Sequence, residues 1–216
     1  MATVYKLHPE NPQGRKVETI AAALRQGAVA LYPTDTVYAI GCDLNHKGAV
    51  QRVRQIKQLA NDKPLTFLCA SLSNIADYAI VSDGAYRLIR RLIPGPFTFL
   101  LPATRQVPRL VMSPKRRTTG IRVPNSAICL ALVETLQNPV ISTSALTLLP
   151  DSETGQIADK MVMFDALEQF VDIIVDDDQP LAHDVSTILD MEGEEPLMIR
   201  QGLGWQKALD WGAQLV

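Results

Sequence analysis

Short apolar runs alternate along this chain with segments whose apolar residues recur every three or four positions. In residues 17–25, Val17, Ile20 and Leu24 fall on one helical face, and the apolar run AVALY follows at 28–32. Further apolar runs lie at 65–69, 97–101, 119–123, 139–143, 171–175, 185–190 and 196–200, and further helical patterns at 47–59, 83–92 and 126–137. This alternation predicts an α/β (α+β-like) fold in which helices flank a mixed sheet. A short helix before residue 83 is expected to take Ser73 as its cap.

Length and composition fit one domain. Of the 216 residues, 47% are apolar and 20% are charged, which excludes disorder over most of the chain. No repeat or shift in composition marks a boundary, so we expect a single domain over residues 1–216. The N-terminus has no apolar signal-peptide core, and no apolar run reaches membrane-spanning length. We therefore expect a cytoplasmic protein with no membrane partner, whose oligomeric state stays open.

Several familiar kinds of site are absent from the sequence. Cys42, Cys69 and Cys129 lie far apart without a CxxC pair, so we expect buried thiols rather than a disulfide framework or a zinc site. The three histidines do not have metal-ligand spacing, and no metal ligands are predicted. Neither a phosphate-binding GxxxxGK[ST] loop nor a GxSxG hydrolase motif occurs.

The small net charge of −2 hides an uneven distribution. Residues 84–133 contain nine basic residues and no acidic one, whereas 151–178 contain nine acidic residues and one lysine. A basic segment can serve an anionic ligand such as nucleotide phosphate or RNA, and it can equally be a solvated face. On the first reading, the basic residues partly form a positive surface at or beside a cavity, and the acidic segment lies elsewhere.

Short polar stretches occur at the expected strand ends and bends. They are 32–36, Lys57 with 63–65, 94–96, 118–122, 142–144, 185–187 and 199–200. Each alone has an ordinary explanation, such as a turn around Asp35 or a solvated helix position at Lys57. Hydroxyls and cations that gather at the ends of strands predict a pocket for an anion with polar groups.

The order of these stretches carries a family resemblance. The segment PTDTVYAIGCD resembles the PT[DE]TVYGLG signature of the YrdC/YciO family, the threonylcarbamoyl-AMP synthases. IKxxxxDKPL, PGPFTFLLP, TTGIRVP, PVISTSA, DVSTILD and MIRQG follow in the family's order, so that the motifs span about residues 9–204. HPENPQGR, KRRTTGIRVP and STSALTLLP are most similar to the YciO branch. The resemblance implies a single YrdC-like domain with a twisted mixed sheet and an open concave basic cavity.

The resemblance also implies a reaction. L-threonine and bicarbonate form a carbamate, whose oxygen attacks the α-phosphate of ATP and releases pyrophosphate, with Mg²⁺ accompanying ATP. The product, threonylcarbamoyl-AMP, serves tRNA modification. Such nucleotidyl transfer depends on positioning and positive charge rather than on a side-chain nucleophile, which fits the lack of a nucleophile–base pair.

Carried over residue by residue, the resemblance assigns two groups of side chains. The residues assigned to L-threonine are Thr36, Arg122, Ser142 and Ser186, with Arg122 on the carboxylate. The residues assigned to the nucleotide are Lys57, Lys63, Thr118, Ser144 and Arg200. Lys57 is the expected catalytic residue, and it and Arg200 are the expected phosphate partners.

Several positions depart from the synthase pattern, among them Thr147-Leu148, which replace the Ser-Gly that follows the family's SxN motif. Leu59 stands where the family's KxR motif has arginine, and Leu146 where SxN has asparagine. Ala39 replaces the glycine that follows the tyrosine of the signature. Loss of a cation and of a short amide weakens contacts with phosphate. Three hypotheses stay open: a synthase with weak or altered activity, a double-stranded RNA or tRNA-binding module of the same fold without that activity, and an α/β protein with an unrelated anionic ligand.

Overall fold

A computed structural model describes residues 1–59, 63–148 and 159–215. Eleven strands join there in one sheet in the order β1-β8-β2-β3-β7-β4-β6-β5-β9-β10-β11. The strands are β1 Thr3–Lys6, β2 Ala30–Tyr32, β3 Ala39–Gly41, β4 Thr66–Leu68, β5 Phe97–Pro102, β6 Thr118–Arg122, β7 Val140–Ser144, β8 Ile173–Asp176, β9 Thr187–Asp190, β10 Leu197–Arg200 and β11 Gln214–Leu215. The helices are α1 Gly14–Arg25, α2 Lys47–Ile56, α3 Leu72–Tyr78, α4 Asp83–Leu92, α5 Ala127–Leu136, α6 Lys160–Leu167 and α7 Trp205–Asp210, with a 3₁₀ turn η1 Leu146–Leu148.

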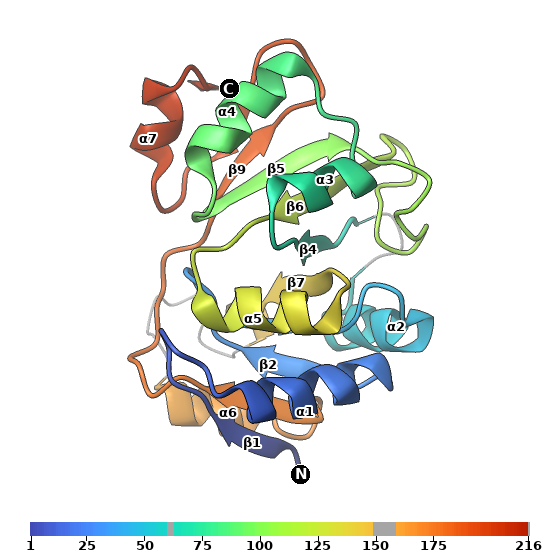
Figure 1. Cartoon of the computed structure of the whole chain (residues 1–216), viewed down its shortest axis with the longest axis vertical. Helices are drawn as coiled ribbons and strands as arrows, with labels where there is room; N and C mark the ends of the chain where they lie inside the picture. Colours follow the sequence, from blue (N-terminus) through green and yellow to red (C-terminus); the bar gives the residue numbers. More distant parts are fainter. Residues whose placement is uncertain (60–62, 149–158, 216) are drawn as a thin grey trace.

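The sheet mixes parallel and antiparallel pairs, which confirms the predicted fold class. Strand pairs β1/β8, β2/β8, β4/β6, β5/β9 and β10/β11 are parallel, and the remaining neighbours are antiparallel. The strands fan from β1 at one end of the molecule to β9 near the other, so the sheet is strongly twisted (Figure 1). Strands β3, β7, β4 and β6 stand side by side in its middle, where the polar stretches of the sequence meet.

Two apolar clusters hold the helices on the sheet. One contains the buried faces of α1 and α5, and the other contains those of α2, α3, α4 and α6. Adjacent strand residues join different clusters: Leu31 and Phe67 belong to the larger one, whereas Tyr32 and Leu68 belong to the smaller. Because side chains alternate across a strand, a shift of one residue would turn these groups to the wrong face, and burial therefore fixes the register.

The structure corrects one predicted cap and adds elements that the patterns did not indicate. Ser71, rather than Ser73, caps α3 by accepting a hydrogen bond from the backbone N–H of Asn74. Strands β1 and β3, helices α6 and α7 and the short β11 are additional. The three cysteines are buried and free, as predicted. None of the helices in the described ranges combines the length and hydropathy that a membrane span requires.

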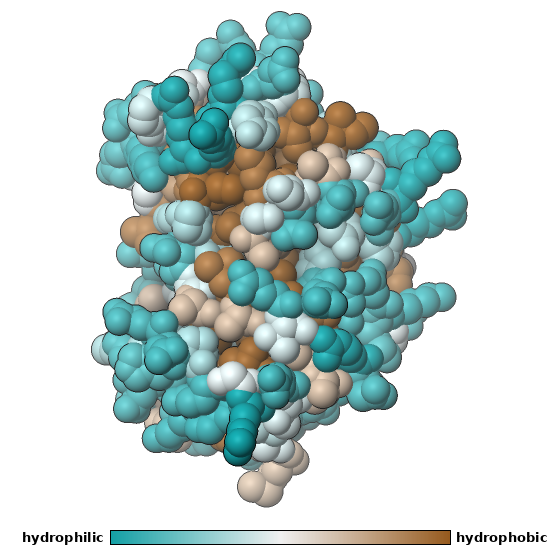
Figure 2. Space-filling view, viewed as in Figure 1, coloured by the Kyte–Doolittle hydropathy of each residue, from teal (hydrophilic) through white to brown (hydrophobic). Residues whose placement is uncertain are grey.

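The face shown in Figure 2 is mostly hydrophilic. Hydrophobic residues gather on it near β5, between α3 and α4. Ile80 in the connection between these helices, and Tyr86 on α4, are exposed. The polar side chains of the candidate site lie elsewhere, at the centre of the sheet.

Candidate functional site

A cavity of about 320 Å³ opens at the middle of the sheet, within the size range of small-ligand sites. Its walls come from neighbouring strands β3, β7, β4, β6 and β5, and from residues at β9 and β10. Seven of the nine residues assigned from the sequence line it: Thr36, Lys57, Arg122, Ser142, Ser144, Ser186 and Arg200. Thr36 and Arg200, which are 164 positions apart in the sequence, thus line the same cavity. Their parts in binding stay predictions.

One end of the cavity is built around Arg122, the last residue of β6. Its Nη2 donates to Oδ1 of Asp35 at 2.7 Å, and its Nη1 donates to Oγ1 of Thr36 at 3.1 Å. Only 7% and 8% of the Arg122 and Asp35 side chains are exposed. The second oxygen of Asp35 accepts from the backbone N–H of Asn125 at 3.0 Å. This buried pair fixes the guanidinium, whose Nε is buried without a hydrogen-bond partner among the described residues.

The turn before β3 places Asp35 and Thr36. Thr34 accepts from the backbone N–H of Thr36 at 3.1 Å and donates to the carbonyl of Val37 at 2.7 Å. This hydroxyl-based turn is the local structure that the residues of the first polar stretch favour. The sequence interpretation treated Asp35 as a turn residue and did not find its pairing with Arg122, because the two are 87 residues apart.

Ser186, just before β9, and Arg200, the last residue of β10, line the same cavity. The Ser186 hydroxyl lies 2.8 Å from that of Thr98, and it accepts from Nη2 of Arg200 at 2.9 Å. Arg200 also donates to the Ser186 carbonyl. Gly202 permits this close approach, since an added Cβ would collide with the Val185 carbonyl oxygen. Burial lowers the pKa of Arg200, and the nearby positive charge of Arg122 lowers it further. Both guanidinium groups line the cavity, so an anion bound there would relieve the repulsion between them.

Lys57 occupies the other end of the cavity, directly after α2. Its ammonium donates to the carbonyl of Ser144 at 2.6 Å and to Oγ1 of Thr147. Burial lowers the pKa of Lys57 to about 8. Leu59 lines the cavity beside it, and the Ser144 hydroxyl is buried without a hydrogen-bond partner in the described part of the chain. This end holds one poorly compensated cation next to an apolar side chain.

Two of the assigned residues lie outside the cavity lining. The Lys63 side chain is exposed, while its backbone carbonyl accepts from Arg54 and the following Pro64 and Leu65 line the wall. Thr118 is buried at the start of β6, opposite Pro102. It lies four positions before Arg122, about 13 Å along a strand. The cavity gives neither residue direct access to a ligand bound within it.

The structure also adds lining residues that the sequence interpretation did not assign. Thr98 lies in an apolar strand between Phe97 and Phe99, and its position on the cavity face follows from period-two alternation. Thr147 lies in η1, a turn that no periodic pattern indicated. Ala39, one of the departures from the synthase signature, lines the cavity and adds a methyl group to its wall.

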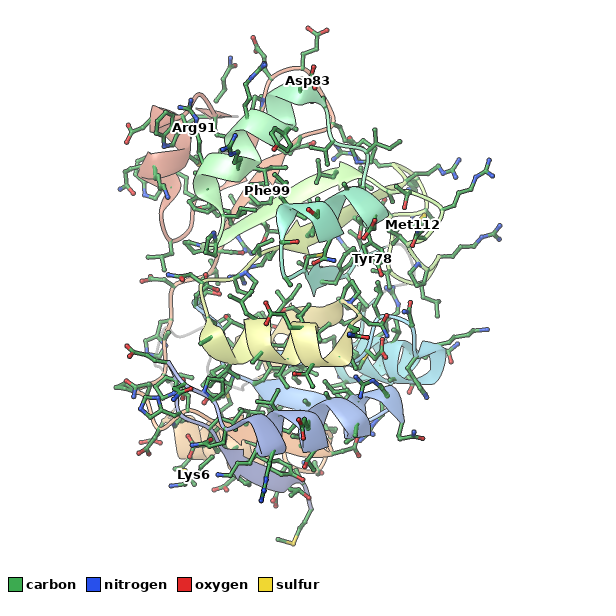
Figure 3. All side chains as sticks on the ribbon, viewed as in Figure 1. Lys6, Tyr78, Asp83, Arg91, Phe99 and Met112 are labelled. Atoms are coloured by element: carbon green, nitrogen blue, oxygen red, sulfur yellow. The ribbon has the colours of Figure 1, made fainter. Side chains whose placement is uncertain are left out.

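The predicted positive surface is only partly found at the cavity. Of the nine basic residues between 84 and 133, Arg122 alone lines it; Lys57 and Arg200 supply the other cations. Arg116 pairs with Asp190 and Glu192, and Arg91 lies 3.9 Å from the ring centre of Trp211, next to α7 in Figure 3. Six others are exposed without an ion pair among the described residues: Arg87, Arg90, Arg105, Arg109, Lys115 and Arg117.

The described acidic residues of 151–178 lie away from the cavity lining, as predicted. Asp172 pairs with Arg52, and Asp176 and Asp177 both pair with Lys160. Asp151 and Glu153 lie outside the described residues. Among the residues that are described, no group of three or more metal-ligating side chains comes together.

The sequence of this chain is similar to those of several known proteins. The Sua5/YciO/YrdC family model, described as "Telomere recombination", matches residues 22–202. The uncharacterized protein YciO of Escherichia coli (strain K12) is 37% identical over 204 residues, covering 94% of this chain and 97% of that protein. A threonylcarbamoyl-AMP synthase of Vibrio vulnificus is 29% identical over 191 residues, covering 86% of this chain and 98% of the synthase.

Solved structures agree on the fold. The crystal structure of E. coli YciO superposes with a TM-score of 0.87 at 36% identity, covering 96% of this chain and 99% of that one. The structure of Pyrococcus abyssi Sua5 complexed with L-threonine has a TM-score of 0.82 at 23% identity and covers all of this chain but 63% of Sua5. The arrangement of the sheet is therefore common to proteins with and without an assigned reaction.

Proposed function

The chain belongs to the Sua5/YciO/YrdC family, and we propose that its cavity binds L-threonine and ATP and forms threonylcarbamoyl-AMP at a reduced rate. The observation that carries the proposal is the meeting of three cations and eight hydroxyl side chains in one cavity of about 320 Å³. The named synthase relatives, and the L-threonine complex of a Sua5 with the same fold, support it.

L-threonine is proposed to bind at the Arg122 end. Asp35 and Thr36 hold Arg122 through one N–H of each terminal nitrogen, and the second N–H of each is the charged donor proposed for the substrate carboxylate. The hydroxyls of Thr36, Ser142 and Ser186 lie on the same cavity and would hold the polar groups of the substrate. Because Asp35 and Thr36 orient the guanidinium beforehand, little conformational entropy is lost when the carboxylate binds.

The nucleotide is proposed to bind between Lys57 and Arg200. These two cations would face its phosphates, with Ser144 beside Lys57. The carbamate formed from the threonine amine and bicarbonate, with loss of water, attacks the α-phosphorus of ATP. A new P–O bond forms, the bond to the β-phosphate breaks, and pyrophosphate leaves. Fixed positive charge that faces the developing negative charge stabilises this transition state.

Mg²⁺ has no protein site in the described residues. Of the residues that the structure describes, no carboxylate lines the cavity, and both oxygens of nearby Asp35 are already bonded to Arg122 and Asn125. Mg²⁺ prefers oxygen ligands and is commonly held by substrate phosphates and water. The proposed reaction therefore takes Mg²⁺ as a companion of ATP and gives no residue the part of a metal ligand.

Leu59 is the reason to propose a reduced rate. It lines the cavity beside Lys57, at the position where the synthase motif has arginine. A charged hydrogen bond contributes about 1.5–3 kcal/mol, so a transition state without one such bond to phosphate forms about tenfold or more slowly. We further propose that the product is formed in the cytoplasm and passed on for tRNA modification.

A second function is favoured by a separate observation. Six exposed cations on α4 and in the connection between β5 and β6 have no ion-pair partner within the described residues. Such residues suit contacts with the phosphates of double-stranded RNA or tRNA. A module that binds RNA without forming the adenylate is therefore the alternative proposal, with binding that weakens as salt concentration rises.

Isotope labelling separates the two proposals. The purified protein is incubated with ATP, L-threonine and ¹³C-bicarbonate, and the products are analysed by mass spectrometry. The synthase proposal expects threonylcarbamoyl-AMP with the label in its carbamoyl carbon, and none when a substrate is omitted or Arg122 is replaced by alanine. If the folded protein forms none while the V. vulnificus synthase does so in parallel, the synthase proposal fails and the RNA-binding proposal takes its place.

A further inference from the structure

The surroundings of the Lys57 ammonium differ from those of an ordinary phosphate-binding lysine. An ammonium has three N–H donors, and here two of them bond to neutral oxygens of one short segment, the Ser144 carbonyl and the Thr147 hydroxyl. That leaves one donor for a ligand in the cavity. A phosphate that binds Lys57 through more than one oxygen must therefore displace one of these two partners.

The charges around Lys57 do not provide it with a counter-ion. Strands β3 and β7 and the turn η1 carry no ionisable side chain. Arg122 and Arg200 line the same cavity, Asp35 is paired with Arg122, and Lys63 follows on the exposed part of the chain. Within the described residues the ammonium is thus held by neutral oxygens and faces cations, so a bound anion would relieve an unfavourable arrangement.

Thr147 is the more replaceable of the two partners. The Ser144 carbonyl belongs to β7 and is fixed by the sheet, whereas Thr147 is an exposed residue of η1. Leu146 and Leu148 on either side pack against the larger apolar cluster, which keeps the Thr147 backbone at the cavity wall. Rotation of one side-chain bond is enough to withdraw its hydroxyl from Lys57.

We propose that Thr147 determines which anions this end of the cavity accepts, because its hydroxyl competes with the ligand phosphate for the Lys57 ammonium. Only an anion that interacts more strongly than this hydroxyl gains access to the second donor. The inference rests on the proposed function in taking the phosphates of a nucleotide as the ligand.

Replacement of Thr147 by valine has a consequence with a distinct pH dependence. In the parent, an anion must displace the Thr147 hydroxyl before it can bind the charged ammonium. In Thr147→Val this hydrogen bond is already absent from the free protein, so it no longer has to be broken. Anions therefore bind the charged form of the variant more tightly. Removal of the same partner lowers the pKa of Lys57 further from its value of about 8. Above that pKa the free lysine is neutral in both proteins, and the advantage of the variant disappears.

The test measures inorganic pyrophosphate binding by isothermal titration calorimetry from about pH 6 to about pH 9, on either side of the Lys57 pKa. The parent, Thr147→Val and Thr147→Ser are compared, and thermal unfolding confirms that all three are folded. The ratio of variant to parent affinity at each pH cancels the titration of pyrophosphate itself. We expect Thr147→Val to bind about tenfold more tightly than the parent at the lowest pH, corresponding to a change of about one pKa unit in Lys57.

At the highest pH, the affinity of Thr147→Val for pyrophosphate is expected to equal that of the parent. Thr147→Ser keeps the hydroxyl, so its affinity is expected to equal that of the parent at every pH. Equal affinities of Thr147→Val and the parent at low pH, weaker binding by Thr147→Val at every pH, or no measurable binding by any of the three proteins overturns the inference. If pyrophosphate binding follows the expected pattern while no labelled adenylate forms, the proposed function fails and the role of Thr147 stands.

Discussion

The two ends of the cavity are built in different ways. At the Arg122 end, a buried ion pair and a hydroxyl hold the guanidinium in place, and nearby Ser186 bonds to both Thr98 and Arg200. At the Lys57 end, the cation is held by a carbonyl and an exposed hydroxyl, beside Leu59 and a buried serine hydroxyl without a partner among the described residues. At the first end, an ion pair fixes the cation before a ligand binds. At the second end, the cation has only neutral hydrogen-bond partners.

The difference between the two ends indicates which part of the proposed reaction is weakened. Recognition of L-threonine depends on the well-bonded end, so we expect it to be retained. Stabilisation of the phosphates depends on the poorly bonded end, so we expect the rate to suffer there. A hydrogen-bond donor stabilises the transition state most when it is fixed in place before the negative charge develops. The predictions below act on one end at a time.

Replacement of Arg122 by alanine is expected to have the largest effect. It leaves the Asp35 carboxylate buried with only the Asn125 N–H as a donor. Removal of one partner from a buried pair costs about 3–5 kcal/mol of unfolding free energy. Urea denaturation measures this decrease, and calorimetry is expected to show no L-threonine binding.

The double variant Asp35→Ala/Arg122→Ala separates stability from binding. With both charges removed, no unpaired carboxylate remains, so we expect most of the unfolding free energy to return while L-threonine binding stays absent. Unchanged stability of the single variant would contradict the buried pair. Recovery of L-threonine binding in the double variant would remove Arg122 from the site.

Restoration of the missing arginine is the second prediction. Leu59→Arg places a cation on the cavity wall beside Lys57 and is expected to raise pyrophosphate release by about tenfold or more. Leu146 packs against the apolar cluster and is not part of the cavity lining, so Leu146→Asn alone is expected to lower stability with little gain in rate. A folded Leu59→Arg variant with parent-like pyrophosphate release would show that charge at this end is not limiting.

The third prediction concerns pH. Burial lowers the pKa of Lys57 to about 8, and a bound phosphate favours the protonated form. ATP binding must therefore take up a proton above that pH, so affinity is expected to fall as pH rises, by somewhat less than tenfold between about pH 7.5 and 9. Calorimetry at each pH measures the change. In Lys57→Arg the side chain stays charged, and a decline of the same size there would rule out Lys57 as its source.

The smallest effects come from a matched pair of serines. Ser186→Ala removes a hydroxyl that contacts Thr98 and Arg200, with an expected decrease of about 1 kcal/mol or more in unfolding free energy. Ser144→Ala removes a hydroxyl without a partner in the described part of the chain, so stability is expected to stay equal or rise slightly. Thermal unfolding compares them. A larger decrease for Ser144→Ala would contradict the difference between the two ends.

Much of this architecture was predictable because local patterns carry it. Apolar runs located the strands of the central sheet apart from β3, and polar stretches at their ends indicated which residues would meet. Seven of the assigned residues do line the cavity. Thr118 does not line the cavity, although it lies on the same strand as Arg122. The sequence pattern identified the strand but not which end of it borders the cavity.

Other features depend on contacts that no local pattern records. Asp35 pairs with Arg122 across 87 residues, and Lys57 bonds to Thr147 across 90. Strand β1 contains just four residues and pairs with β8 near the far end of the chain. Short elements of this kind are stabilised by tertiary pairing rather than by their own sequence. The basic segment likewise spreads over exposed surfaces, since net charge does not specify which side chains face a cavity.

The most direct test of the central claim is the initial rate of pyrophosphate release from ATP, measured beside the V. vulnificus synthase. The account predicts slow release by this protein that requires both L-threonine and bicarbonate, and that disappears in Arg122→Ala. Release that is equally fast without L-threonine, or no release by a folded protein that binds both ATP and L-threonine, would contradict the claim that this cavity is a weakened synthase site.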